Sequence, residues 1–255
     1  MGPTQSNEFR SPKVEMLFGD DPWVSKKENG ILYRWNIYKC MFSSGNITEK
    51  QRIGAWDCSD EIIVDLFAGI GYFTLTYLKH AEAKHVYACE WNPDSVEALK
   101  INLQLNNVSD RCTVLFGDNR ITAPKNVADR VNLGLLPSAK CSWMVACEAL
   151  RKDQGGLLHI HENVDTVDCQ NMNAIDSDTN RDTKSDLVRI GPNVHFLYVS
   201  WRNWAVGTAD EICKMFVDLY PHQKWVIFIT GIIKVKSYGP RIYHLVLDLK
   251  CCPQL

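Results

Sequence analysis

The sequence has no long apolar run and no excess of positive charge. Its longest apolar stretch, Trp225 to Ile233, contains Thr230 and Gly231 and is too short to cross a bilayer. The polar opening segment, residues 1–13, lacks the apolar core of a signal peptide, so we expect a cytoplasmic protein without a membrane span. The 28 Lys+Arg against 30 Asp+Glu give a formal charge of −2, which excludes a global positive field for holding nucleic acid. Any such contact must be local.

Cysteines are also sparse for a protein held together by disulfides. The ten cysteines of this chain form no C-x-x-C pair, so we expect reduced thiols, no disulfide partner and no metal site. What the chain does have is 255 residues that are 45% hydrophobic and 23% charged, which is enough for one sizeable core with a small appendage. This composition excludes collagen, a coiled coil and full disorder.

The amino-terminal part predicts a small β appendage. Asn29-Gly30 is a strong hairpin signal between Trp23-Val24 and the alternating apolar residues from Ile31 to Ile37. We therefore expect a disordered tail over 1–12, followed by the appendage and a linker helix over 13–57.

From Glu61 onward, apolar runs alternate with helical patterns. Strands are expected over 61–67, 85–90, 112–117, 130–136 and 157–162, and helices over 72–80, 93–106 and 138–152. Strands separated by helices of this length predict an α/β fold with a doubly wound parallel sheet.

The last third of the chain departs from this alternation. Residues 165–186 are rich in Asp, Asn, Thr and Ser, which predicts a loop or disorder, and a helix resumes over 208–220. Two β runs, 224–236 and 241–250, flank a short turn and must pair antiparallel. A parallel sheet with an antiparallel terminal hairpin is typical of a class I methyltransferase-like, Rossmann-like domain, expected here over 58–255.

The segment from Ile62 to Gly71 is a candidate cofactor cradle. A strand ending at Asp65 runs into Gly69-x-Gly71 just before a helix, which lets the backbone approach a ligand closely. Thr74 stands where a dinucleotide fingerprint would have its third glycine. The alternative is an ordinary strand-to-helix turn that needs small residues.

Acidic residues end the next two strands. Glu90, 21 residues after Gly69, is placed to accept hydrogen bonds from both hydroxyls of a ribose. Asp118 and Asn119 follow the third strand, where Asp118 can take the amine of an adenine, and Trp91 is placed to stack on its face. Asp118 and the missing third glycine favour S-adenosylmethionine over NAD. A turn acid at Asp118 and a partly exposed turn aromatic at Trp91 are the alternatives.

Ser43 and Lys50 precede the glycine loop and bear on the site only if they fold back over it. A cation there pairs with the carboxylate of a methionine moiety. By composition alone, a solvated helix lysine is the favoured interpretation of Lys50.

Several motifs together resemble one known family. They are FSSGNITEK (42–50), DLFAGIGYF (65–73), CEWNP (89–93), FGDNR (116–120), GLLPS (134–138), GLLHIH (156–161) and VKSY (235–238). In this order they resemble the tRNA wybutosine-synthesizing protein 2 family, which is related to the enzymes that methylate N1 of guanine 37 in tRNA. The likeness covers roughly residues 13–164 and 224–252.

The resemblance implies transfer of the 3-amino-3-carboxypropyl arm of S-adenosylmethionine to the tricyclic base at position 37 of tRNA-Phe. It also implies that Ser43, Lys50, Glu90, Asp118 and Asn119 hold this co-substrate. Such proteins carry an amino-terminal tRNA-binding domain, whereas almost nothing precedes Lys13 here, so we expect a fragment, an isoform or a divergent copy with a weakened RNA grip.

The chemistry agrees with the expected absence of a metal. The sulfonium already supplies a neutral leaving group, methylthioadenosine, so positioning carries most of the acceleration and no catalytic side chain is assigned. Pro137 and Ser138, after the fourth strand, are candidates to line the base pocket, or else form an ordinary helix start.

Two other functions stay open: a tRNA guanine-37 methyltransferase with the same fold, and a non-catalytic scaffold that only binds S-adenosylmethionine. Three further groups of residues have structural alternatives. His159 and His161 share a strand face and are core or substrate-facing residues rather than metal ligands. Trp201 and Trp204 stack on bases or pack under a helix. The cluster of Lys234, Lys236, Arg241 and His244 is a candidate phosphate contact or a solvated turn.

Overall fold

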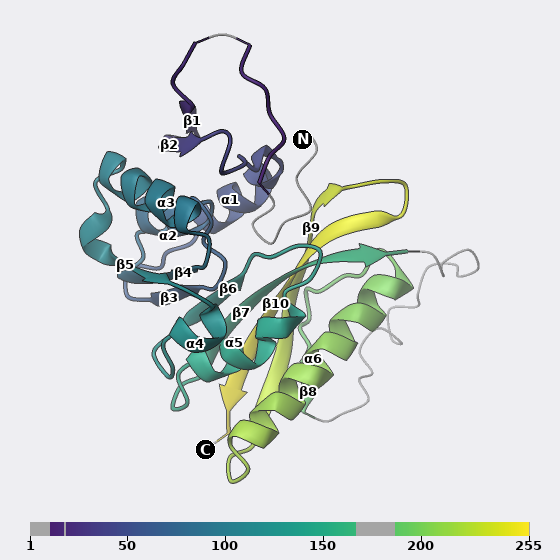
Figure 1. Ribbon diagram of the computed structural model, residues 1–255. Helices are drawn as coiled ribbons and strands as arrows, with labels where there is room; N and C mark the ends of the chain where they lie inside the picture. Colours follow the sequence, from purple (N-terminus) through teal and green to yellow (C-terminus); the bar gives the residue numbers. More distant parts are fainter. Residues whose placement is uncertain (1–10, 18, 167–186, 255) are drawn as a thin grey trace. The chain divides into compact units, whose positions relative to one another are not determined.

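The computed structural model describes residues 11–17, 19–166 and 187–254 (Figure 1). Contacts between residues divide the chain into two compact units, Met1–Ala123 and Pro124–Leu255. Each unit combines helices with strands, and the antiparallel terminal hairpin is present, so the predicted fold class is confirmed. The predicted boundary at residue 58 between appendage and main domain stays a prediction.

The first unit begins with the predicted hairpin. Strands β1 (Trp23–Glu28) and β2 (Ile31–Asn36) pair antiparallel. Asn29 and Gly30 join them with φ angles of 51° and 80°, the left-handed conformation that a tight two-residue hairpin turn requires.

Side chains of a helix complete the hydrogen bonding of β2. Asn106 accepts a 3.0 Å bond from the Leu32 N–H and donates a 2.7 Å bond to the Leu32 carbonyl. Asn102 accepts a 2.6 Å bond from the Arg34 N–H. The hairpin is therefore fixed to helix α3 (Pro93–Leu105) rather than left as an independent appendage.

Three parallel strands and four α-helices follow the hairpin in the first unit. These strands lie in the order β5-β4-β3. The elements in chain order are α1 (Ile47–Gly54), β3 (Ile62–Asp65), α2 (Thr74–Lys79), β4 (His85–Glu90), α3, β5 (Cys112–Phe116) and α4 (Asn119–Thr122). Asn92 caps α3 by accepting a 3.0 Å bond from the Asp94 N–H, with Pro93 at the first helical position, as predicted.

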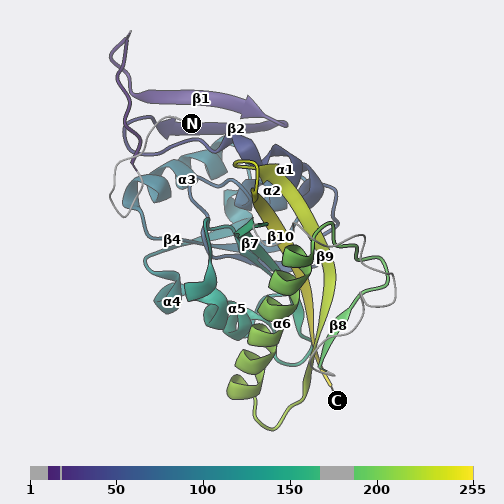
Figure 2. The same ribbon diagram turned by 90° about the vertical axis from the view of Figure 1, so that its right-hand side faces the viewer.

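The second unit is a mixed sheet with the strand order β6-β7-β10-β9-β8. Strands β6 and β7 are parallel, and β10 pairs antiparallel with both β7 and β9. The elements are β6 (Arg130–Leu133), α5 (Trp143–Ala149), β7 (Gly156–Asp165), β8 (Val188–Ile190), α6 (Val199–Leu219), β9 (Trp225–Ser237) and β10 (Ile242–Pro253). Helix α6 packs along β9, as both views show (Figures 1 and 2).

Several boundaries differ from the sequence prediction, and three of them show the cause or extent most clearly. Helix α6 begins at Val199 instead of residue 208, because Trp201 and Ala205 are buried in its first turns. Strand β7 continues to Asp165, since β10 pairs with it along its whole length. The predicted helix over 138–152 is shorter, at Trp143–Ala149. Residues 1–10 of the predicted tail and 167–186 of the predicted loop lie outside the described residues.

Candidate functional site

The glycine loop leaves the carboxyl end of β3 with a backbone that only glycine tolerates. Gly69 and Gly71 have φ angles of +56° and +101°. A Cβ atom on Gly69 would lie 2.8 Å from Cε2 of Tyr72. The Ala68 N–H donates a 3.0 Å bond to the Cys89 carbonyl, which holds the loop against the end of β4. The loop therefore presents bare backbone beside the next strand.

The structure brings Glu90 onto this loop. Its Oε2 accepts a 2.7 Å hydrogen bond from the Gly69 N–H, and its Oε1 accepts a 2.8 Å bond from the Asn92 N–H. Burial raises the pKa of Glu90 above its ordinary value, although the backbone N–H groups of Asn92, Gly69 and Trp91 oppose the shift. The Glu90 carboxylate is thus held beside the glycine backbone, and each of its two oxygens can accept a further hydrogen bond.

Asp65 and Asn119 hold the loop from behind. Asp65 is fully buried, and its Oδ2 accepts a 2.7 Å bond from the hydroxyl of Thr74, the residue in place of a third glycine. Buried Asn119 donates a 2.8 Å bond from Nδ2 to the Leu66 carbonyl. Both side chains fix the course of the backbone between β3 and α2, which is a positioning role.

Asp118 caps the short helix α4. Its carboxylate accepts a 2.9 Å bond from the Arg120 N–H and a 2.5 Å bond from the Arg120 guanidinium. The hydrogen bond from the Arg120 side chain holds the pKa of Asp118 below its ordinary value. Asp118 is therefore ionised and partly turned toward its own helix.

Exposed apolar side chains gather at the carboxyl ends of β4 and β5. Trp91 follows β4 and is 47% exposed, while Phe116, paired with Glu90 across the strands, is 59% exposed. Ile121 on α4 is 84% exposed. Sequence reasoning identified Trp91 but missed Phe116 and Ile121, although Phe116 stands directly before the Gly-Asp-Asn motif.

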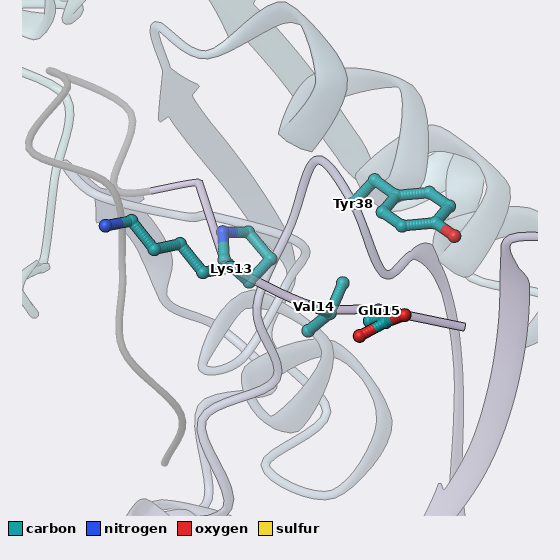
Figure 3. A pocket seen from close by; sticks show the side chains of 5 residues that line it. Lys13, Val14, Glu15 and Tyr38 are labelled. Atoms are coloured by element: carbon teal, nitrogen blue, oxygen red, sulfur yellow. The ribbon is translucent and has the colours of Figure 1, made fainter. Parts of the chain in front are cut away.

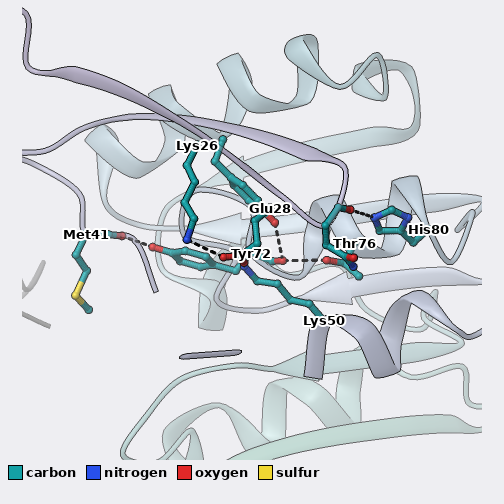
Figure 4. Close-up of polar contacts among 9 residues, drawn as sticks. Lys26, Glu28, Met41, Lys50, Tyr72, Thr76 and His80 are labelled. Atoms are coloured by element: carbon teal, nitrogen blue, oxygen red, sulfur yellow. Dashed lines mark hydrogen bonds and ion pairs between the residues drawn. The ribbon is translucent and has the colours of Figure 1, made fainter. Parts of the chain in front are cut away.

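Lys50 lies inside the first unit, bound to the hairpin. Its Nζ donates a 2.8 Å hydrogen bond to Oε1 of Glu28, and both side chains are buried (Figure 4). The Lys50 ammonium also faces three aromatic rings, with centroids 4.9, 5.1 and 5.5 Å away for Tyr33, Phe42 and Tyr72. Glu28 has no counterpart among the predicted site residues. Its signal in the sequence was a carboxylate directly before the Asn-Gly turn.

The charges of this cluster depend on one another. Burial lowers the pKa of Lys50, and the hydrogen bond with Glu28 opposes that shift. Burial by itself raises the pKa of Glu28, but the hydrogen bonds from Lys50 and Lys26 outweigh it and hold the pKa below its ordinary value. Lys26 reaches Glu28 at 2.9 Å. With all three groups ionised, the cluster carries one net positive charge.

Tyr72 connects this cluster to the glycine loop. It directly follows Gly71, and its hydroxyl donates to the Met41 carbonyl (Figure 4). It also hydrogen-bonds with the backbone of Ser43. Burial raises the pKa of Tyr72 well above its ordinary value, so the hydroxyl stays protonated. Ser43 and Lys50 therefore do fold back to the glycine loop, with Tyr72 as their common neighbour.

Pro137 and Ser138 belong to the second unit, where they lie against the end of β7. The Pro137 carbonyl accepts a 2.8 Å bond from the Asn163 N–H, and Ser138 forms a β-bridge with Glu162. The Ser138 hydroxyl also accepts a 3.2 Å bond from the Lys140 N–H, at the start of a short 3-10 turn. The segment is thus fixed at the carboxyl end of its sheet.

The histidines of β7 are structural. Nδ1 of His159 lies 2.6 Å from Oδ1 of Asp248, and its Nε2 lies 2.9 Å from the Arg130 guanidinium. His161 bonds to His244 at 3.0 Å. Within the described ranges, no group of three or more His, Cys, Asp or Glu side chains is arranged to hold a metal ion.

Other features of the described chain lie apart from these residues. A shallow pocket of about 500 Å³ is lined by Pro12, Lys13, Val14, Glu15 and Tyr38, none of which is a predicted site residue (Figure 3). The nine cysteines at described positions are free thiols. Of the helices at those positions, none combines the length and apolar character needed to span a bilayer.

Comparison with known proteins gives consistent results. A family model described as the TRM5/TYW2 methyltransferase domain matches residues 24–183. The tRNA wybutosine-synthesizing protein 2 homolog of Danio rerio is 48% identical over 246 residues, covering 96% of this chain and 59% of that protein. The chain thus spans less than two thirds of the length of this relative.

Two solved structures are similar over most of the chain. The M. jannaschii TYW2 in complex with AdoMet has a TM-score of 0.70 and 27% identity, covering 94% of this chain and 90% of that one. The P. horikoshii TYW2 in complex with MeSAdo has a TM-score of 0.67 and 26% identity, covering 93% and 74% respectively.

Proposed function

Since this chain belongs to the TRM5/TYW2 methyltransferase domain family, we propose that it transfers the 3-amino-3-carboxypropyl group of S-adenosylmethionine to the tricyclic wybutosine-precursor base at position 37 of tRNA-Phe. The names of its relatives support the tRNA substrate and the pathway. AdoMet in the M. jannaschii relative supports the donor. MeSAdo, bound by the P. horikoshii relative, is what remains of the donor after its aminocarboxypropyl arm has left, which favours arm transfer over methyl transfer.

The observation that carries the proposal is the contact between Glu90 and Gly69. A carboxylate held 2.7 Å from the Gly69 N–H has free acceptor positions beside a backbone without side chains. This arrangement suits a ribose, whose two hydroxyls donate to one carboxylate while the loop passes close to the nucleoside. The backbone at this position stays without a side chain because a Cβ on Gly69 would collide with Tyr72.

The neighbouring residues suit an adenine. Trp91, Phe116 and Ile121 offer apolar surface at the ends of β4 and β5, where a flat base is removed from water. The ionised carboxylate of Asp118 accepts a hydrogen bond from the exocyclic amine, and Asn119 keeps the strand end in place. Asp65 and Gly71 act by shaping the loop.

We assign the methionine end of the donor to the side of Tyr72, Ser43 and Lys50. The cluster of Lys26, Glu28 and Lys50 has one net positive charge, which attracts the donor carboxylate. Because Glu28 holds the Lys50 ammonium, the position of this charge is fixed before the donor arrives. A fixed amino acid tail determines which carbon of the sulfonium faces the RNA.

The reaction needs positioning more than acid or base catalysis. The donor supplies a sulfonium whose Cγ–S bond breaks with the electron pair passing to sulfur, while Cγ bonds to a carbon of the base, which then loses its proton. The protein orients the two reactants, an effect worth about 7–11 kcal/mol where alignment is good. Pro137 and Ser138 are our candidates for lining the base pocket, because they follow β6 and lie beside the carboxyl-terminal part of β7.

Donor labelled separately in the methyl group and in the carboxyl group tests the proposal. The chain is incubated with tRNA-Phe carrying the precursor base, and the RNA is then analysed for each label. Carboxyl label in the RNA is the expected result. Methyl label alone would identify a guanine-37 methyltransferase, and donor binding without transfer of either label would identify a scaffold.

A further inference from the structure

The tip of the β9–β10 hairpin carries a local positive charge on a chain whose net charge is −2. Residues 232–244 contain three Lys or Arg and no Asp or Glu. Lys234 and Arg241 are exposed, and Lys236 is half-buried. No carboxylate at a described position forms an ion pair with any of the three cations. We call Lys234, Lys236, Tyr238 and Arg241 the hairpin-tip surface.

Aromatic rings hold two of these cations in place. Nζ of Lys234 lies 4.6 Å from the ring centroid of Tyr243, and Nζ of Lys236 lies 4.4 Å from that of Tyr238. Tyr243 in turn stacks on Tyr198, with centroids 5.9 Å apart and an interplanar angle of 25°. A solvated turn needs no such order. Lysine ammonium groups that are held over aromatic rings and have no carboxylate partner can bind an anionic group of another molecule.

The hairpin-tip surface lies at the functional end of the second unit. Ile242, the first residue of β10, pairs with Asp165, the last residue of β7. Two residues earlier on β7, the Asn163 N–H binds the Pro137 carbonyl. The tip therefore lies at the carboxyl-terminal end of β7, where the candidate base-pocket residues Pro137 and Ser138 also lie.

We propose that the hairpin-tip surface binds the sugar–phosphate backbone of the RNA beside the nucleotide that is modified. This inference rests on the proposed function, because it deepens how the RNA is held. The three cations contact phosphates, which carry affinity without sequence information. Tyr238, 48% exposed, contributes an aromatic face next to the backbone, the combination found in proteins that bind unpaired nucleotides. The hairpin-tip surface would thus give a chain of negative net charge a local site for RNA binding.

The test replaces all three cations in the full chain, as Lys234→Gln/Lys236→Gln/Arg241→Gln. The probe is a fluorescent transcript of the tRNA-Phe anticodon stem-loop, titrated by anisotropy over a series of salt concentrations. We expect at least a tenfold loss of affinity at low salt. Each lost phosphate contact should also reduce the slope of log K against log salt by about 0.7–0.9.

A matched control has the same charge change at the opposite end of the second unit. It is Lys214→Gln/Lys224→Gln/Lys250→Gln, three exposed lysines, of which Lys250 pairs with Leu157 near the amino end of β7. This control should keep the affinity and the slope of the unaltered chain. Calorimetry with S-adenosylmethionine should give the same donor affinity for both triple variants, since the donor residues lie in the first unit.

The outcomes separate this inference from the proposed function. An unaltered chain that binds no RNA, or a hairpin-tip variant with unchanged affinity and slope, overturns the inference. An equal loss in the control also overturns it, because binding would then follow total charge. If the unaltered chain transfers the carboxyl label while the hairpin-tip variant binds RNA normally, the proposed function stands without this surface. If the chain binds RNA through the hairpin-tip surface but transfers no label, the surface is confirmed as an RNA-binding site and the proposed transferase function is wrong.

Discussion

The Lys50 ammonium donates a hydrogen bond of 2.8 Å to the Glu28 carboxylate, joining helix α1 to strand β1 inside the first unit. The side chains are only 2% and 7% exposed. Glu28 has a second partner in Lys26, whereas the other neighbours of the Lys50 ammonium are the faces of three aromatic rings. The two residues of this ion pair are therefore not equivalent. Without Lys50, Glu28 still has an ammonium partner, whereas without Glu28 the Lys50 ammonium has no carboxylate partner.

This inequality predicts an order of stability among variants. Glu28→Gln leaves a buried ammonium without its carboxylate and should lower the free energy of unfolding by about 3–5 kcal/mol. Lys50→Met should cost less, because Glu28 keeps Lys26. The measurement is urea denaturation at neutral pH. Lys39→Met is the control: its pair with Asp94 is exposed and screened by water, so the free energy of unfolding should stay nearly unchanged. Equal losses for Glu28→Gln and Lys50→Met would contradict the unequal pair.

Donor binding should depend on pH through Glu90. Burial raises the pKa of Glu90 above 4.5, and ribose hydroxyls donate to the ionised form. Affinity is therefore complete above the raised pKa and falls as the pH decreases through it, beginning above the ordinary titration range of a glutamate. Glu90→Gln should remove this dependence and weaken binding about 10- to 150-fold, which corresponds to about 1.5–3 kcal/mol.

Calorimetry with S-adenosylmethionine from mildly acidic to neutral pH measures both effects. The control is Glu97→Gln, an exposed carboxylate on α3, which should keep the affinity and the pH profile of the unaltered chain. A Glu90→Gln variant that still loses affinity in acid would place the titrating group elsewhere.

Gly69 should be intolerant of even a methyl group. At a φ of +56°, and with Cε2 of Tyr72 at 2.8 Å from the added carbon, Gly69→Ala strains the loop by about 1–3 kcal/mol. Because the Gly69 N–H binds Glu90, we also expect donor affinity to fall at least tenfold in calorimetry. Gly207→Ala on α6 meets open space and should raise the free energy of unfolding by up to about 1 kcal/mol. Similar behaviour of the two variants would mean that the loop relaxes freely.

The buried chain of Asp248, His159 and Arg130 should support the second unit without affecting the donor. Asp248→Ala removes the carboxylate 2.6 Å from His159 and should lower the free energy of unfolding by about 1.5–3 kcal/mol, the range for a hydrogen bond to a charged group. Asp153→Ala, which breaks an exposed pair with Arg151, should leave the free energy of unfolding nearly unchanged. Thermal or urea unfolding checks both variants. Altered donor affinity in folded Asp248→Ala would give this network a role beyond stability.

Local signals in the sequence were sufficient for the hairpin turn, the start of α3 and the position of Glu90 at the end of β4. Asn29-Gly30 predicts the hairpin because both residues accept a positive φ, and Asn92-Pro93 predicts the start of α3 because one caps and the other fits the first turn. Glu90 stands at a strand end in the sequence, and parallel strands bring their carboxyl ends to one edge. Its approach to Gly69 follows from that geometry.

Only the tertiary structure decided which charges and rings meet. Glu28 and Lys50 are 22 residues apart on a strand and a helix, and no periodicity relates them. The start of α6 at Val199 and the full length of β7 also depend on neighbours, because Trp201 is buried by packing and Asp165 is paired by β10. The sequence by itself determined local backbone conformation, since that depends on adjacent residues. The partners of buried charges were decided by long-range packing, because their desolvation can be offset only by groups that the fold brings together.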